Sequence, residues 1–260
     1  MITVNGKVAP TFAVKAGERI RLRLVNVANG RVFAPDFSGL DAHVVAVDGM
    51  YAARPLDPAG FELAPGNRLD LDITLPASLR GRRLPLTDRF TRRPVLLGAI
   101  AVGDEIVGTP RFASPARAHV PEWRTVAALP VRSEYRLNAR AGGPFGIEWT
   151  INGEAFTHEG AHDGPHGSIR VLPAGEWSKL RFVNESFRLH PMHVHGQFFK
   201  VLSRNGKPVD EPHWRDTVLV HAQETVDVGM VPQDEGRWML HCHILEHAES
   251  GMMTLVDVRR

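Results

Sequence analysis

The stretch HCHILEH at residues 241–247, taken together with HPMHVHG at residues 190–196, decides how this chain folds and what it can bind. The two stretches hold six of the chain's thirteen histidines and its only cysteine. Both are interpreted as β-strands, in which successive side chains point to opposite faces. The spacing of the histidines then decides which of their side chains lie on the same face of a strand.

Strand alternation separates the side chains of these stretches into two sets. His241 and His243 share one face of their strand, and Cys242 points to the opposite face. His193 and His195 likewise share a face of the other strand. The pattern therefore predicts four imidazoles on one side and a single thiolate on the other.

The side chains around the cysteine form a recognisable ligand set. His247 follows Cys242 by five residues and Met252 follows by five more, so the intervening loop can fold back onto a metal held by the thiolate. His190 comes from the other stretch. Two histidines, one cysteine and a weak axial methionine are typical of blue copper. Zinc is the alternative metal, but it prefers tetrahedral cysteine and histidine ligands without methionine.

Both stretches resemble the closing motifs of the multicopper oxidases, the laccase-like family. The last domain of that family carries H-P-x-H-x-H-G and then H-C-H-x-x-x-H-x-x-x-G-M, and both patterns are complete here in the same order. The resemblance implies that a type 1 copper is bound by His190, Cys242, His247 and Met252. It implies that type 2 and type 3 coppers are bound by His193, His195, His241 and His243.

The resemblance also implies an activity. Family members oxidise small electron-rich reductants, such as phenols, aromatic amines or metal ions, and reduce dioxygen to water. Electrons would enter at the type 1 copper and pass through Cys242 to His241 and His243, which makes these three the expected catalytic residues. The cofactor does the chemistry, and the protein positions and tunes it.

Composition sets further limits on the function. A length of 260 residues suits two domains, and 43% hydrophobic with 23% charged residues suits globular cores. A net charge of +2 predicts no strong attraction to nucleic acid or to an anionic membrane, and no apolar run reaches the length of a membrane span. The first residues lack a signal-peptide pattern, although the resemblance implies a periplasmic or extracellular location.

An internal repeat predicts the domain organisation. Residues 4–7, VNGK, recur as INGE at 151–154, and residues 22–26, LRLVN, recur as LRFVN at 180–184. Alternating patterns and turn residues fill both halves. We therefore expect an all-β chain of two cupredoxin-like Greek-key β-sandwich domains. The first covers residues 1–107 and lacks copper ligands, residues 108–130 form a linker, and residues 131–260 bind copper.

The first half is poor in histidine. Residues 1–118 contain only His43, and no H-x-H motif precedes His193, whereas the family's type 2/type 3 cluster takes eight histidines. The type 1 site is therefore expected to be complete and the cluster half complete, as in the middle and last domains of a three-domain oxidase without its first domain. A first domain or a partner chain would have to supply the missing ligands. The alternatives are a blue-copper electron-transfer protein and a catalytically inactive fragment.

Overall fold

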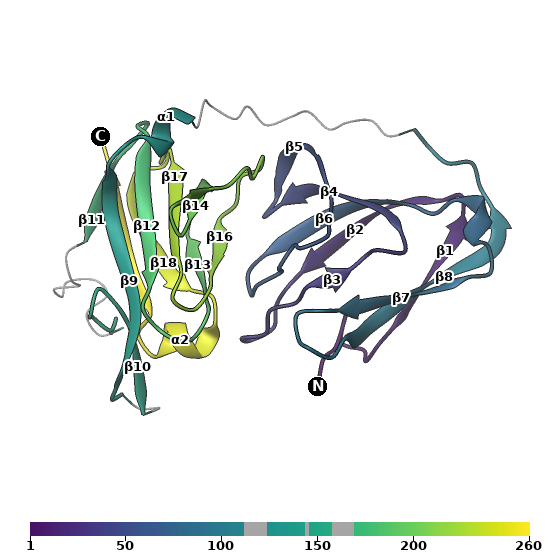
Figure 1. Ribbon diagram of the computed structural model, residues 1–260, viewed down its shortest axis with the longest axis horizontal. Coiled ribbons are helices and arrows are strands. Elements are labelled where there is room, and N and C mark those ends of the chain that lie inside the picture. The colour runs from purple at the N-terminus through teal and green to yellow at the C-terminus, as the bar shows by residue number, and fades with distance from the viewer. Residues whose placement is uncertain (112–123, 144–145, 158–168) are drawn as a thin grey trace. The chain divides into compact units, whose positions relative to one another are not determined.

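The computed structural model describes residues 1–111, 124–143, 146–157 and 169–260 (Figure 1). The chain divides into two compact units, each built almost entirely of β-strands. The first contains Met1–Asn26, Arg31–Leu63 and Asn67–Ala118, and the second contains Val27–Gly30, Ala64–Gly66 and His119–Arg260.

The first unit is a sandwich of two four-stranded sheets, with strand orders β1-β8-β7-β3 and β2-β6-β4-β5. Buried Val44 and Leu71 of one sheet pack in the same apolar cluster as Ile100 of the other, so the core lies between the sheets. Its elements are β1 Thr11–Ala16, β2 Arg19–Val25, β3 Pro35–Asp36, β4 Asp41–Val47, β5 Met50–Leu56, β6 Arg68–Thr74, the short 3-10 helix η1 Ala77–Leu79, β7 Arg83–Asp88 and β8 Val95–Ile106.

The pairing of β2 with β6 shows why the alternating sequence forms this sandwich. Leu71 and Ile73 of β6 are fully buried, while the intervening aspartates point to the opposite face. There Arg19 pairs with Asp72 across the two strands. The apolar face supplies burial, and the charged face supplies cross-strand ion pairs of modest strength.

The second unit is a sandwich of a six-stranded sheet, β10-β9-β12-β17-β14-β15, and a five-stranded sheet, β11-β19-β18-β13-β16. Its core contains Phe182 and Val228 of the larger sheet and Leu240 of the smaller one. The elements are α1 Arg124–Ala127, β9 Val131–Ala141, β10 Ile147–Ile151, β11 Arg170–Pro173, β12 Ser178–Asn184, β13 His190–Val194, β14 Phe199–Arg204, β15 Lys207–Pro208, β16 Thr217–Val220, β17 Thr225–Met230, β18 Gly236–Cys242, α2 Leu245–Glu249 and β19 Met253–Arg259. The predicted fold class, all-β with two sandwich domains, is confirmed.

The repeated Asn-Gly dipeptides form the same turn in both units. Asn5 and Asn152 have φ of 51° and 54°, and the glycines that follow them have φ of 74° and 82°. In each unit the residues on either side of the turn form an antiparallel bridge. Two successive positive φ angles are the conformation that Asn-Gly favours in a tight hairpin.

The repeat extends to strand register and to an ion pair. Arg23 stands opposite Asp70 on β2 and β6, and Arg181 stands opposite Asp227 on β12 and β17. In the second unit Arg181 Nε donates to Asp227 Oδ1 at 2.7 Å. The sequence repeat therefore corresponds to a duplicated strand pair.

The segment predicted as a linker, residues 108–130, lies mostly outside the described residues. Its end, which is described, contains α1, where Val126 is fully buried and Lys179 Nζ donates to the Ala127 carbonyl at 3.0 Å. The predicted boundaries at residues 107 and 131 stay predictions.

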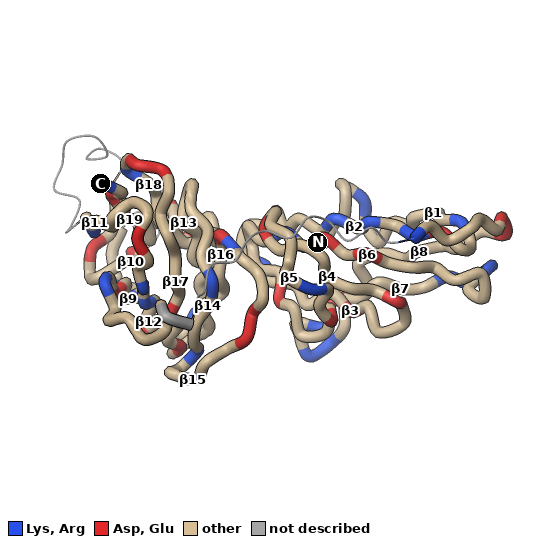
Figure 2. Tube along the Cα trace, turned by 90° about the horizontal axis from the view of Figure 1, so that it is seen from above, with Lys and Arg blue, Asp and Glu red and all other residues tan. Residues whose placement is uncertain are grey.

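Charges of both signs are interspersed along each unit (Figure 2). His43, the one histidine of residues 1–118, is half exposed on β4, with Nδ1 3.7 Å from an Asp41 carboxylate oxygen. Among the residues that the structure describes, none of the helices has the length and apolar character that crossing a lipid bilayer requires.

Candidate metal centre

Two neighbouring strands of the smaller sheet bring the histidine-rich stretches together. Strands β13 and β18 pair antiparallel, with Met192 opposite Cys242 and His193 opposite His241. The pairing continues one residue further, where the His243 amide donates to the Pro191 carbonyl at 2.7 Å. Because side chains alternate along both strands, this register separates the potential ligands into two groups.

The first group lies around the cysteine. The Sγ atom of Cys242 is 3.8 Å from Nδ1 of His190 and 3.6 Å from Nδ1 of His247, and the two Nδ1 atoms are 3.1 Å apart. Cys242 and His190 are completely buried, whereas His247 is half buried. Three donor atoms thus converge on one point, as metal binding requires.

The loop after Cys242 returns to the cysteine through a short helix. This helix is α2, Leu245–Glu249, which carries His247. The amide of Met252 then donates to the His247 carbonyl at 2.9 Å, and the Cys242 amide donates to the Met252 carbonyl at 3.0 Å. Met252 is completely buried in the same core cluster as Cys242.

Burial sets the protonation of the first group. It lowers the pKa of His190 to about 3, with a smaller contribution from His247. It lowers the pKa of His247 to about 4, with Arg188 contributing further. Burial also raises the pKa of the Cys242 thiol. At neutral pH both imidazoles are therefore neutral and able to ligate, and metal binding would displace the thiol proton.

The second group lies on the other face of the same strands. It brings together His193, His195 and His241, whose nearest ring nitrogens lie within 4.8 Å of one another. Nε2 of His195 and Nε2 of His241 are 3.0 Å apart. The ring of His243 lies 5.7 Å from those of both His193 and His241, measured between centroids. All four predicted imidazoles are thus neighbours, although the tight group contains three.

Backbone carbonyls fix the tautomers of two histidines in the second group. Nδ1 of His193 lies 3.0 Å from the Asp216 carbonyl, and Nδ1 of His241 lies 2.8 Å from the Cys242 carbonyl. A carbonyl only accepts, so each Nδ1 carries the proton and each Nε2 keeps its lone pair. Such contacts orient histidine ligands in metal sites.

A serine fixes the tautomer of His190 in the first group. Ser186 Oγ lies 2.8 Å from His190 Nε2, and also 2.9 Å from Asn184 Oδ1 and 3.2 Å from the Arg188 carbonyl. The last two atoms only accept, so with the hydroxyl proton on one of them the oxygen accepts from His190 Nε2–H, which is the arrangement that lets Nδ1 bind a metal. The lone pair of Nδ1 is therefore left facing Cys242.

Sequence reasoning did not identify Ser186, nor the indole of Trp149. The ring of Trp149 lies 3.9 Å from that of His247 and 5.1 Å from that of His190, between centroids. Neither residue belongs to a motif, and neither contact follows from strand periodicity.

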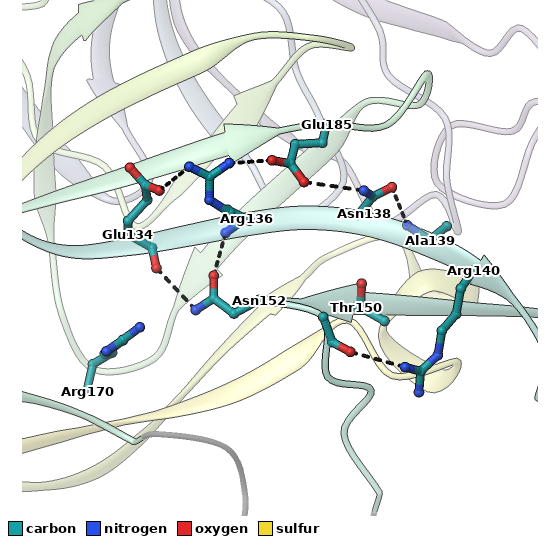
Figure 3. Close-up of a pocket in the computed structure, with 10 residues that line it drawn as sticks. Glu134, Arg136, Asn138, Ala139, Arg140, Thr150, Asn152, Arg170 and Glu185 are labelled. Carbon is teal, nitrogen blue, oxygen red and sulfur yellow. Dashed lines mark hydrogen bonds and ion pairs between the residues drawn. The ribbon is translucent and has the colours of Figure 1, made fainter.

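A polar pocket lies elsewhere in the second unit, on β9 and β10 (Figure 3). Its volume is about 540 Å³, and Arg136 bridges Glu134 at 2.8 Å and Glu185 at 2.5 Å within it. Arg170 also lines the pocket, and its buried Nε has no hydrogen-bond partner among the residues that the structure describes. None of the residues described as lining it belongs to the two histidine groups.

The buried Cys-His-His group and the histidine cluster lie on opposite faces of the same strands. Comparisons with known proteins find this chain similar to proteins of one family. A family model described as multicopper oxidase matches residues 129–260, and a second of the same description matches residues 1–80. The chain belongs to the multicopper oxidase family. Membership implies copper as the cofactor.

Individual relatives match along nearly the whole chain. Multicopper oxidase MmcO of Mycobacterium tuberculosis is 27% identical over 271 residues, which cover 98% of this chain and 50% of the relative. A laccase of Bacillus subtilis is 27% identical over 294 residues, covering 99% and 54%. The crystal structure of a multi-copper oxidase from Pseudomonas thermotolerans superposes with a TM-score of 0.80 at 27% identity, covering 99% and 59%. The chain thus spans about half the length of the curated relatives it matches.

The serine contact generates a prediction for the copper-free protein. Ser186→Ala leaves the buried His190 Nε2–H without its acceptor, so the free energy of unfolding should fall by about 1–3 kcal/mol. Denaturant titration followed by circular dichroism measures the change. Ser178→Ala is the matched control, because Ser178 is also buried in the same unit and its hydroxyl has no hydrogen-bond partner within the described part of the chain. Equal effects of the two substitutions would contradict the assigned role of Ser186.

Proposed function

We propose that the chain is a copper-dependent oxidoreductase of the multicopper oxidase type. In this proposal residues 131–260 form the copper-binding domain, residues 1–107 form a domain without copper ligands, and residues 108–130 link them. The observation that carries the proposal is the position of Cys242, whose sulfur lies within 4 Å of two histidine nitrogens while its sequence neighbours join a separate histidine group.

The donor set of the first group suits copper better than zinc. One thiolate and two neutral imidazoles converge there, and a methionine follows on the buried return of the loop. Soft sulfur with imidazole and a weak axial thioether is the ligand chemistry of type 1 copper. His190, Cys242, His247 and Met252 would hold this ion. Copper bound in this way supplies one-electron redox chemistry.

The chain's own residues have separate roles in this scheme. Ser186 and the buried core orient His190 and keep water from the sulfur. His193, His195, His241 and His243 would provide the imidazoles for type 2 and type 3 coppers. Cys242 joins the two groups covalently through His241 and His243, its neighbours in the chain, so that electrons accepted at one face reach the other through bonds.

The proposed substrates are inferred from the family and not from the shape of a binding pocket. We infer that small phenols, aromatic amines or reducing metal ions donate electrons at the half-buried His247 side. Dioxygen is the acceptor once another domain or a partner chain supplies the remaining imidazoles of the cluster, and its four-electron reduction to water consumes protons as well as electrons. The names of the relatives, multicopper oxidase and laccase, support this class of reaction.

One observation favours a second candidate, a blue-copper electron-transfer protein. Residues 1–118 contain a single histidine, so these 260 residues offer half of the imidazoles that the family's oxygen-reducing cluster uses. In that case electrons would leave the type 1 copper for a partner, and dioxygen would not be reduced.

The first prediction of this proposal concerns colour. The copper-loaded chain should absorb intensely toward the red end of the visible spectrum, and Cys242→Ser should abolish the absorption because the copper–thiolate bond is lost. His243→Gln is the control: it changes the adjacent residue on the opposite face and should leave the colour intact. A colourless wild-type chain that has bound copper with its thiol reduced would refute the type 1 assignment.

The second prediction concerns oxygen. A polypeptide of these 260 residues, incubated with copper and a phenolic substrate, should not sustain oxygen consumption, because half a ligand shell leaves each cluster copper open to water and to chelators. An oxygen electrode and copper analysis after dialysis test this together. Retention of four coppers with steady oxygen uptake would contradict this prediction and would mean that residues other than His193, His195, His241 and His243 complete the cluster.

A further inference from the structure

The indole of Trp149 contacts both histidines of the Cys242 group. Its ring is tilted by 30° to that of His247, with centroids 3.9 Å apart, and meets the ring of His190 edge-on at 70° and 5.1 Å. Only 9% of Trp149 is exposed. One side chain from β10 therefore covers both imidazoles whose Nδ1 atoms face the sulfur.

The backbone around Trp149 also holds the loop that carries His247 and Met252. The Trp149 amide donates to the Ser250 carbonyl at 2.9 Å, and the Phe156 amide donates to the Gly251 carbonyl at 3.0 Å. The segment from β10 to Phe156 thus binds two consecutive carbonyls of the loop, immediately before Met252.

Gly251 shows how closely this segment approaches the loop. Its φ is +110°, and a Cβ added there would lie 2.7 Å from Cβ of Ala155 and 2.9 Å from the Trp149 carbonyl oxygen. The position has neither the backbone conformation nor the space for a larger residue. The loop is therefore seated against residues 149–156 before any metal binds.

We propose that Trp149 is a positioning residue of the copper pocket: its indole fixes the rings of His190 and His247 and excludes water from them. The proposal rests on the type 1 assignment made above. Offset and edge-on aromatic contacts have preferred geometries, so a ring held on two sides loses rotational freedom before the metal arrives. An apolar cover also disfavours the more highly charged, oxidised state of a bound copper, because it replaces water near the ligands.

Trp149→Leu tests the role because it keeps apolar bulk but removes the ring. We expect copper release to a chelator to be faster by roughly tenfold, the visible bands to shift, and the midpoint potential to fall as water reaches His247. Trp149→Phe keeps part of the aromatic face and should lie between Trp149→Leu and the wild type. These readouts do not depend on oxidase activity.

Trp177→Leu is the matched control. Trp177 belongs to the same unit and stacks on Trp214, with centroids 6.1 Å apart. Its loss should lower stability without changing the release rate, spectrum or potential. If the wild type is blue and folded Trp149→Leu has the same copper release rate, spectrum and midpoint potential as the wild type, the proposal is overturned. If Trp149→Leu does not fold, a wild-type result for Trp149→Phe has the same meaning. A colourless wild type would instead overturn the type 1 assignment, and this inference with it.

Discussion

The alternation of side chains along β18 is the constraint on which the candidate centre depends. Cys242 points into the core toward His190 and His247, while His241, its neighbour on the strand, points to the opposite face. A strand cannot present consecutive residues on the same face, so two groups of ligands separated by one peptide unit follow from the backbone itself. The antiparallel register with β13 aligns the faces of the two strands, since His193 stands opposite His241 and Met192 stands opposite Cys242.

The fold around this strand supplies what a metal site needs before a metal is present. Ser186 and the carbonyls of Asp216 and Cys242 set which ring nitrogens keep a lone pair. The core buries the sulfur, so its thiol stays protonated until a metal displaces the proton. Rigid support of this kind matters because a ligand shell that is correctly composed but loosely held binds metal weakly.

The sequence predicts the strand elements well because their signals are local. Alternation identifies β2 and β6, and the Asn-Gly turns identify the repeat. Alternation also predicts that four of the histidines lie on the face opposite Cys242, whereas the full set of His190 and His247 with the cysteine is what the family resemblance implies. The contact of Trp149 could not be predicted because it depends on tertiary packing, and that of Ser186 could not because it depends on the conformation of the turn before β13. Trp149 lies 98 residues before His247, and Ser186 reaches His190 only through the turn between them.

The unit made mostly of residues 1–118 illustrates the difference between fold and site. It repeats the hairpin turn and the Arg–Asp strand pair of the second unit, yet has no histidine apart from His43. The duplicated features are those that form a β-sandwich, and the candidate metal ligands occur in one copy. A family fold therefore gives no evidence of a copper site without the ligand residues themselves.

X-ray absorption at the copper edge, on the chain loaded with one equivalent of copper, tests the central claim most directly. The account predicts one short copper–sulfur distance together with two imidazole nitrogens, because the first ion should occupy the complete group at Cys242, His190 and His247 rather than the half-complete histidine cluster. A first copper coordinated only by nitrogen and oxygen, with no sulfur neighbour, would contradict it.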